Sequence, residues 1–126
     1  MAFIKLFPRE GSDYLPVEEV IERLRSEFDY VEIDEEEGRD HVGGMIAATL
    51  RFSDELPWKQ ERLKTLQKLQ RHSVYIFFGD HSEAIAAFCF MPDSEMFFGS
   101  PEEVDGAARI IVTRAAQVLK YELFEG

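Results

Sequence analysis

Two short apolar runs that follow one another constrain the fold of this chain more than any other feature. Residues 74–79 (VYIFFG) and 84–91 (AIAAFCFM) are apolar at nearly every position, and four polar residues separate them. Short runs rich in β-branched and aromatic residues are typical of buried strands, and the polar separator predicts a hairpin. Because these strands are apolar on both sides, each face of their sheet needs a covering layer.

The last helix of the chain is the expected cover for the second face. If that face stayed open, Tyr75, Phe77, Phe88 and Phe90 would form a contiguous exposed aromatic patch. Large exposed apolar patches are uncommon on monomeric proteins. We therefore expect the C-terminal helix to fold across this face, and a homodimer packed sheet to sheet is the next explanation.

Hydrophobic periodicity predicts the other elements. Strands are expected at residues 2–7, 30–34, 45–53 and 96–98, and helices at 17–28, at 58–72 and from 100 to about 124. Ser100 and Glu103 form a capping box with Pro101 at the first helical position, which is a strong start signal for the last helix. The charged run 34–40 predicts a solvated loop. The alanine content of 45–53 also permits a helix there.

The order of these elements is β-α-β-β-α-β, followed by one or two further strands and a long helix. The first six elements match the ferredoxin-like split βαβ pattern. We expect one α+β domain over residues 1–126, with a mixed or antiparallel sheet of five to six strands and three helices. Its core would be ferredoxin-like, with a C-terminal hairpin strand and the long helix added to it.

Composition limits the compartment and the partners. Cys89 is the single cysteine, so no intramolecular disulfide is possible, and a reducing, cytoplasmic compartment fits best. The apolar start of the chain is interrupted by Lys5 and Pro8, so we expect no membrane segment. The net charge of −11 argues against nucleic-acid binding.

The charge is also unevenly distributed along the chain. Residues 10–40 carry thirteen acidic and three basic residues, whereas residues 58–79 carry five basic residues and one acidic residue. We therefore expect a non-catalytic protein-binding module that docks a basic partner protein, because complementary charge raises association rate and specificity. The expected partner-binding residues are Glu18, Glu22, Glu32, Asp34, Glu35, Glu36, Glu37 and Asp40.

A small-ligand-binding regulatory domain is the alternative hypothesis. Its pocket would lie between the sheet and the C-terminal helix and would be lined by Tyr75, Phe77, Phe88 and Phe90. Packing in the core explains the same four aromatic residues equally well.

An enzyme is the third hypothesis. His81 lies beside Asp80 and Glu83 at the expected hairpin tip, where it could act as a general base. Turns select the same residue types without any chemistry. Because no set of acid, base and nucleophile emerges from the spacing, we predict no catalytic residue and no cofactor.

The sequence predicts no metal site. His41 and His72 each stand alone, and the carboxylates of residues 34–40 lack the spacing of a calcium-binding EF-hand loop. A solvated run of like charges explains them. Cys89 lies in an apolar strand without cationic neighbours, so we expect an unreactive core residue.

The helix expected at 58–72 has a basic face next to the single tryptophan, Trp58. Such a face could meet an acidic partner or a nucleic acid, although solvated helix faces commonly carry this charge. The helix could also lie beside the acidic helix at 17–28 and spend its charge within the molecule. The basic residues are Lys59, Arg62, Lys64, Lys68 and Arg71.

Overall fold

The two apolar runs form the hairpin expected of them, as strands β3 (Val74–Gly79) and β4 (Ala86–Phe90) of a computed structural model that describes residues 2–126. Strand β2 (Tyr30–Asp34) pairs with the other edge of β3, which gives an antiparallel sheet of order β2-β3-β4. A second antiparallel sheet has the order β5-β1-β6. Its strands are β5 (Met96–Gly99), β1 (Ile4–Pro8) and β6 (Tyr121–Glu125).

One face of the β2-β3-β4 sheet builds the main core. Ile76, Phe78 and Phe88 point to this side and are almost fully buried. They pack with the apolar faces of α1 (Val17–Glu27) and α4 (Ala107–Leu119), which lie side by side. The burial of these large side chains is the principal source of stability for the body.

The other face of the same sheet is covered in part by α2 (Glu35–Leu50). Cys89 packs there with Val42 of α2, and the ring of Tyr75 meets that of His41 edge-on. The C-terminal helix was expected to cover this face, but it lies with α1 on the first one. Helix α4 instead contacts α1 and leads directly into β6, which pairs with β1 in the other sheet.

The loop expected at 34–40 and the strand preferred at 45–53 were wrong, because residues 35–50 form α2. The helix that the alanine content permitted at 45–53 is the one observed, as far as Leu50. Asp34 caps this helix by accepting a hydrogen bond from the backbone N–H of Glu37 at 2.9 Å, and three glutamates in the first turn favour its positive end. The charged run is therefore a helix start. In the second half, Met45, Ile46 and the buried Thr49 have helical spacing and face α3.

The helix expected from Ser100 is shorter and begins later. The capping box forms, with Glu103 donating its backbone N–H to the Ser100 hydroxyl at 3.3 Å, but it closes only one turn. Gly106 has a φ of +56°, and α4 starts at the next residue. Lys120 has a left-handed φ of 58° and ends the helix, so the last residues form β6.

The ferredoxin-like order is not observed. The elements follow one another as β-α-β-α-α-β-β-β-α-β, and the strands divide into two sheets of three. The coarser expectation is confirmed, since residues 2–126 form an α+β fold with four helices and six antiparallel strands. No helix in this range has the length and hydropathy needed to cross a bilayer.

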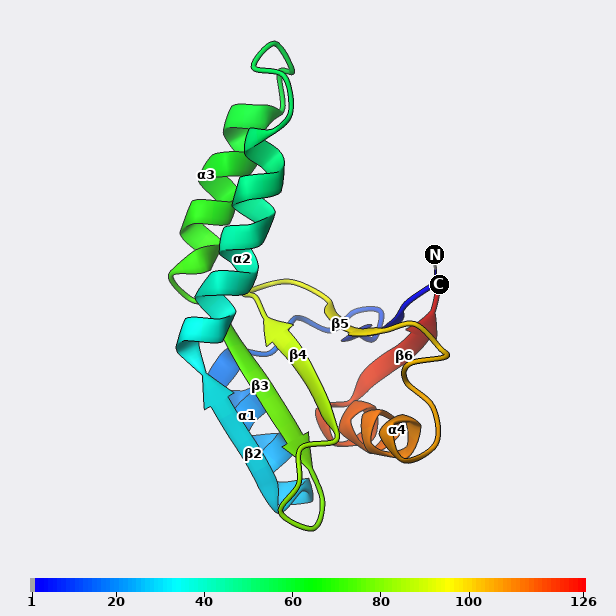
Figure 1. Ribbon diagram of the computed structural model, residues 1–126. Helices are drawn as coiled ribbons and strands as arrows, with labels where there is room; N and C mark the ends of the chain where they lie inside the picture. Colours follow the sequence, from blue (N-terminus) through cyan, green and yellow to red (C-terminus); the bar gives the residue numbers. More distant parts are fainter. Residues whose placement is uncertain (1) are drawn as a thin grey trace.

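Helices α2 and α3 (Lys59–Gln70) form an antiparallel hairpin that projects away from the two sheets, and we call it the arm (Figure 1). Thus α3 pairs with α2 rather than with the acidic helix α1. Lys59 closes the tip of the arm: its ammonium group is buried and donates to the carbonyl oxygens of Leu50 and Phe52, and it pairs with Asp54. These bonds satisfy carbonyl groups at the end of α2.

The two ends of the described chain, residues 2–126, lie together on the body (Figure 1). Phe3 and Gly126 exchange two backbone hydrogen bonds, at 3.1 and 3.0 Å, which extend the pairing of β1 with β6.

Gly38 tests the contact on which the position of the arm depends. A Cβ atom at Gly38 would lie 2.5 Å from the Cα atom of Val74, so backbone would have to move. We expect Gly38→Ala to lower the free energy of unfolding by about 1–3 kcal/mol. In the same helix, a Cβ at Gly44 meets nothing within 4 Å, and Gly44→Ala should raise stability by about 0.5–1 kcal/mol. Chemical denaturation of both variants measures the difference; equal effects would contradict the packing described.

Candidate functional site

The predicted acidic residues lie on three consecutive elements, α1, β2 and the first turns of α2. Helix α1 and strand β2 are joined by two residues and run in opposite directions, and both are about 16 Å long. The start of α1, with Glu18, therefore lies near the end of β2, and Glu22 follows one turn later. Glu32 and Asp34 stand opposite Phe77 and Tyr75 in the sheet, so their side chains point to the face that α2 covers, away from α1. The first turns of α2 add Glu35, Glu36, Glu37 and Asp40, and we call these eight residues the acidic junction.

The carboxylates of the acidic junction are mostly exposed and have few partners within the described chain. Asp34 is half-buried as the cap of α2, and the other seven residues are exposed. Glu35 lies 4.0 Å from Arg39, a weak ion pair in water. Glu32 accepts a hydrogen bond from the hydroxyl of Tyr30, which raises the pKa of that tyrosine. The junction therefore presents its negative charge to solvent.

Part of this charge also stabilises the fold. Glu18 lies in the first turn of α1, and Glu35 to Glu37 lie in the first turn of α2. Carboxylates at these positions interact favourably with the positive end of a helix. Glu22, Glu32 and Asp40 lie outside both first turns, so helix stabilisation does not account for their placement.

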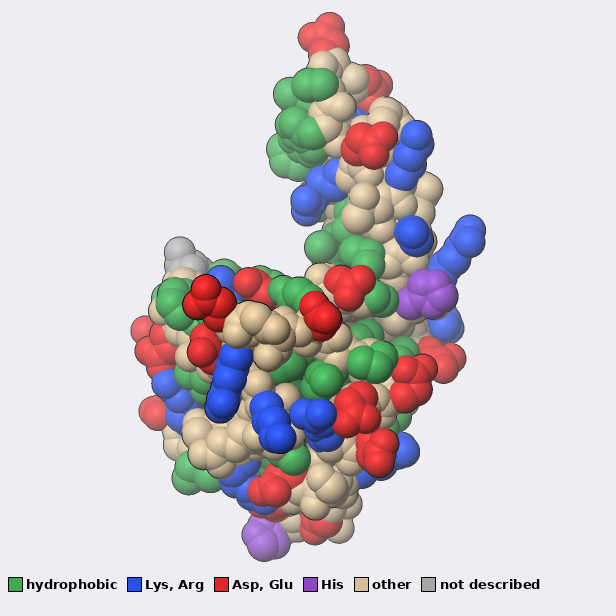
Figure 2. Space-filling view, turned by 180° about the vertical axis from the view of Figure 1, so that it is seen from behind, with side chains coloured by type: hydrophobic (Ala, Val, Ile, Leu, Met, Phe, Trp, Pro, Cys, Tyr) green, Lys and Arg blue, Asp and Glu red, His purple; other side chains and the backbone are tan. Residues whose placement is uncertain are grey.

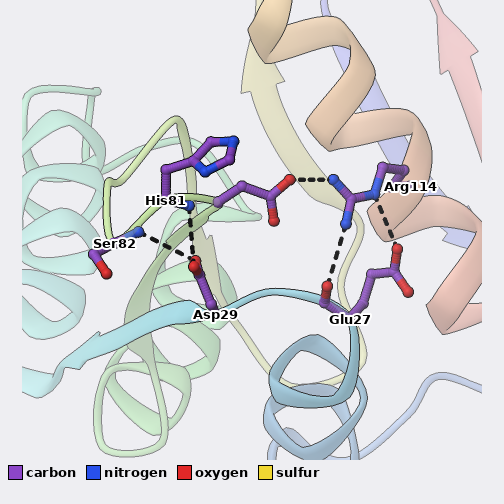
Figure 3. Close-up of polar contacts among 6 residues, drawn as sticks. Glu27, Asp29, His81, Ser82 and Arg114 are labelled. Atoms are coloured by element: carbon purple, nitrogen blue, oxygen red, sulfur yellow. Dashed lines mark hydrogen bonds and ion pairs between the residues drawn. The ribbon is translucent and has the colours of Figure 1, made fainter.

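The turn that carries His81 is held by a carboxylate from another strand connection (Figure 3). His81 and Ser82 both have left-handed backbone angles, with φ of 59° and 57°. Their two N–H groups donate to Asp29 at 3.1 and 3.2 Å. Successive N–H groups in this conformation form a small anion-binding concavity, and here the protein supplies its own anion.

Asp80 pairs with a different partner, Arg114 of α4. The guanidinium of Arg114 also pairs with Glu27 at 2.9 Å and lies over the ring of Phe28 at 4.8 Å. Hydrogen bonds to Asp80 and Glu27 raise the pKa of Arg114. The imidazole of His81 points away from Asp29 (Figure 3). The cluster therefore joins α1, α4 and the hairpin, and Asp80 pairs with Arg114 instead of His81.

Asp29 is the residue whose loss should loosen this turn. We expect Asp29→Ala to reduce the free energy of unfolding by about 1 kcal/mol, because two backbone donors lose a charged acceptor. Glu83→Ala is the matched control, since Glu83 is exposed in the same turn, and its effect should stay within about 0.5 kcal/mol. Urea denaturation compares them. A loss in the control as large as in Asp29→Ala would refute the anchoring role.

The four aromatic residues expected to line a ligand pocket do not share one space. Phe88 and Phe90 are buried in the main core, where the ring of Phe98 packs against Phe88 at 5.5 Å. Tyr75 and Phe77 point to the opposite face of the sheet. Tyr75 does line a hollow of about 230 Å³ beside β4 and α4. That volume is below the range of typical small-molecule sites, about 300–1,000 Å³.

Cys89 is buried, as expected, and burial raises the pKa of its thiol to about 11. Within residues 2–126, no three His, Cys, Asp or Glu side chains are grouped in a way that could hold a metal ion.

The thiol of Cys89 should be protected in the folded protein. At pH 8 a thiol with this pKa has roughly 100-fold less thiolate than an unperturbed cysteine, and burial slows access further. We expect a disulfide reagent to modify the native chain at least this much more slowly than the chain unfolded in guanidinium. Absorbance of the released thiolate measures both rates, and similar rates would show that the strand opens readily.

A larger hollow lies where the sequence predicted none, between the arm and the body. It has a volume of about 570 Å³ and continues along the arm into a second hollow near the tip. Figure 2 shows apolar side chains near the tip of the arm on the side that faces the body. We call this surface the arm groove; its main lining residues are Met45, Phe52, Trp58, Arg62, Leu66, Leu69 and Met91.

Sequence reasoning missed this groove because Met45 and Phe52 were placed in a strand. Trp58, at the start of the basic helix, was the one available signal, and it is 43% exposed at the tip.

Comparison with protein-family models, with curated proteins and with solved structures gave no match to this chain.

Proposed function

We propose that this chain is a non-catalytic protein-binding module whose acidic junction docks a basic partner protein. The observation that carries the proposal is the exposure of seven of these eight carboxylates on α1, β2 and α2, with one weak ion pair among them. Concentrated and unpaired charge of one sign steers an oppositely charged surface during encounter.

The distribution of charge over the whole chain would also orient the partner. Residues 43–72, which make up most of the arm, contain six basic and three acidic residues. The rest of the chain contains eight basic and twenty-two acidic residues. A basic protein is therefore attracted to the acidic junction and repelled by the exposed lysines of α3, Lys64 and Lys68. This arrangement favours one docking orientation.

Two charge variants distinguish binding through the acidic junction from a general effect of net charge. In the first variant Glu18, Glu22 and Glu36 become Gln and Asp40 becomes Asn, which removes four negative charges from the junction. In the control variant Glu10, Glu83, Glu102 and Glu122 become Gln, which removes four exposed charges elsewhere. Both variants change the net charge equally. None of the eight residues takes part in an ion pair or a side-chain hydrogen bond within residues 2–126.

The probe is an immobilised lysine-rich peptide, and association rates are measured at several salt concentrations. We expect the junction variant to associate about tenfold more slowly than the native chain at low salt, and the control variant to change much less. For the native chain the rate should fall as salt is added, because exposed charges are screened over about 10 Å at 0.1 M. Equal losses in the two variants would show that net charge alone is responsible and would remove the proposal.

A further inference from the structure

Three segments that are distant in sequence meet around a further hollow, which has a volume of about 410 Å³. They are the residues that lead into α1, the turn after α3 and the turn after β4. The volume is within the range of ligand-binding pockets, about 300–1,000 Å³. We call this space the junction hollow, because Glu18 of the acidic junction is part of its lining; its main lining residues are Tyr14, Pro16, Glu18, His72, Phe90, Pro92 and Asp93.

The walls of the junction hollow are held in place by the body. The backbone N–H of Leu15 donates to the hydroxyl of Tyr121 at 2.8 Å, and Tyr121 is itself buried on β6. Phe90 is buried at the end of β4. In the turn after β4, the hydroxyl of Ser94 donates to the carbonyl oxygen of Pro92 at 3.1 Å. A hollow with fixed walls receives a side chain at little cost for ordering its own residues.

The lining combines ring faces with negative charge. Two aromatic residues, Tyr14 and Phe90, line the hollow together with two prolines. Its carboxylates are Glu18 and Asp93, which are exposed and take part in no ion pair within residues 2–126. No lysine or arginine of this range lines it. An apolar hollow bordered by two carboxylates fits a long side chain that is apolar along its stem and positive at its end.

The surroundings favour entry of that side chain from the acidic junction. Lys68 lines the adjoining hollow along α3, which shares His72, Pro92 and Asp93 with the junction hollow. A cation is therefore repelled on the side of α3 and attracted on the side of Glu18. Because Glu18 belongs to the acidic junction, a basic protein that is steered there reaches the hollow without leaving the negatively charged surface.

We propose that the junction hollow receives an arginine side chain of the basic partner, with its methylene groups against Tyr14 and Pro92 and its guanidinium near the carboxylates of Glu18 and Asp93. The inference rests on the proposed function and specifies the partner as a basic protein that presents an arginine.

The chemistry of the lining favours arginine over lysine. A planar guanidinium stacks on ring faces, and it is more weakly hydrated than an ammonium group, so it enters an apolar site at lower cost. Arginine side chains that fill pockets are also frequent hot spots of protein interfaces.

Three fluorescent lysine-rich peptides that differ at one central position test the proposal. The position carries arginine, lysine or leucine, and dissociation constants are measured at about 0.3 M salt, where long-range attraction is screened. We expect the native chain to bind the arginine peptide about threefold more tightly than the lysine peptide, and the leucine peptide most weakly.

Asp93→Asn removes one carboxylate from the hollow and none from the acidic junction. Asp93 has a left-handed φ of 53°, which asparagine also tolerates, so the turn should keep its conformation. We expect this variant to bind the arginine peptide about threefold more weakly, as is typical when a partly exposed ion pair is lost. Glu102→Gln, which removes one exposed charge elsewhere on the body, is the matched control and should change the affinity by less than about 1.5-fold.

Two further variants separate the hollow from the junction. Tyr14→Leu keeps an apolar side chain but removes the ring, so the preference for arginine over lysine should disappear. A triple variant, Glu22→Gln, Glu36→Gln, Asp40→Asn, leaves Glu18 in place. It should slow the association of all three peptides and keep the preference for arginine.

Three results would overturn the inference. The native chain could bind the arginine and lysine peptides equally, or Glu102→Gln could weaken binding as much as Asp93→Asn. A leucine peptide that binds as tightly as the arginine peptide would assign the hollow to an apolar side chain. In each case, slower association of the triple variant would leave the proposed function standing. The proposed function itself fails if the triple variant associates as fast as the native chain.

Discussion

The fold depends on a hairpin that is apolar on both faces. Strands β3 and β4 carry large apolar side chains on both faces, so helices must cover the sheet on each side. Helices α1 and α4 fill one side. On the other side α2 crosses at Gly38 and then leaves the sheet with α3, so the same helix that covers the second face also begins the arm. Both candidate surfaces follow from this geometry, because the acidic junction lies where α2 starts and the arm groove lies where it has left the body.

Local sequence patterns predicted a helix or strand correctly where all the patterns in a segment favoured the same structure. The helices at α1 and α3 and the hairpin of β3 and β4 follow from simple periodicity and composition. Residues 34–53 carry conflicting signals: a charged run, two glycines and an alternating apolar pattern. The deciding interaction was the cap by Asp34, which makes the charged run the first turns of a helix. Ser100 shows the converse, since its capping box is real but closes a single turn before Gly106.

The candidate surfaces were predictable to different degrees. The acidic junction was expected as a stretch of sequence, and the nearness of the start of α1 to the end of β2 follows from the two-residue connection between them. The arm groove was not predictable, because it depends on α2 being a helix and on the hairpin projecting from the body. Tyr75 and Phe88 show a further limit. They were expected to line one pocket, but their side chains point to opposite faces of the sheet. Which side chains of β3 and β4 share a face depends on the register between the two strands. Two runs that are apolar at nearly every position do not specify that register.

The paired ends give the molecule a property of its own. Because Phe3 and Gly126 are hydrogen-bonded to each other, the chain forms almost a closed ring, and its opening lies on the body well away from the tip of the arm (Figure 1). A short linker could therefore join the ends without strain, and new ends could be cut elsewhere in exposed turns. For the same reason, a fluorescent protein fused to either end would leave the molecule from the same place, and both fusions would keep the arm unobstructed.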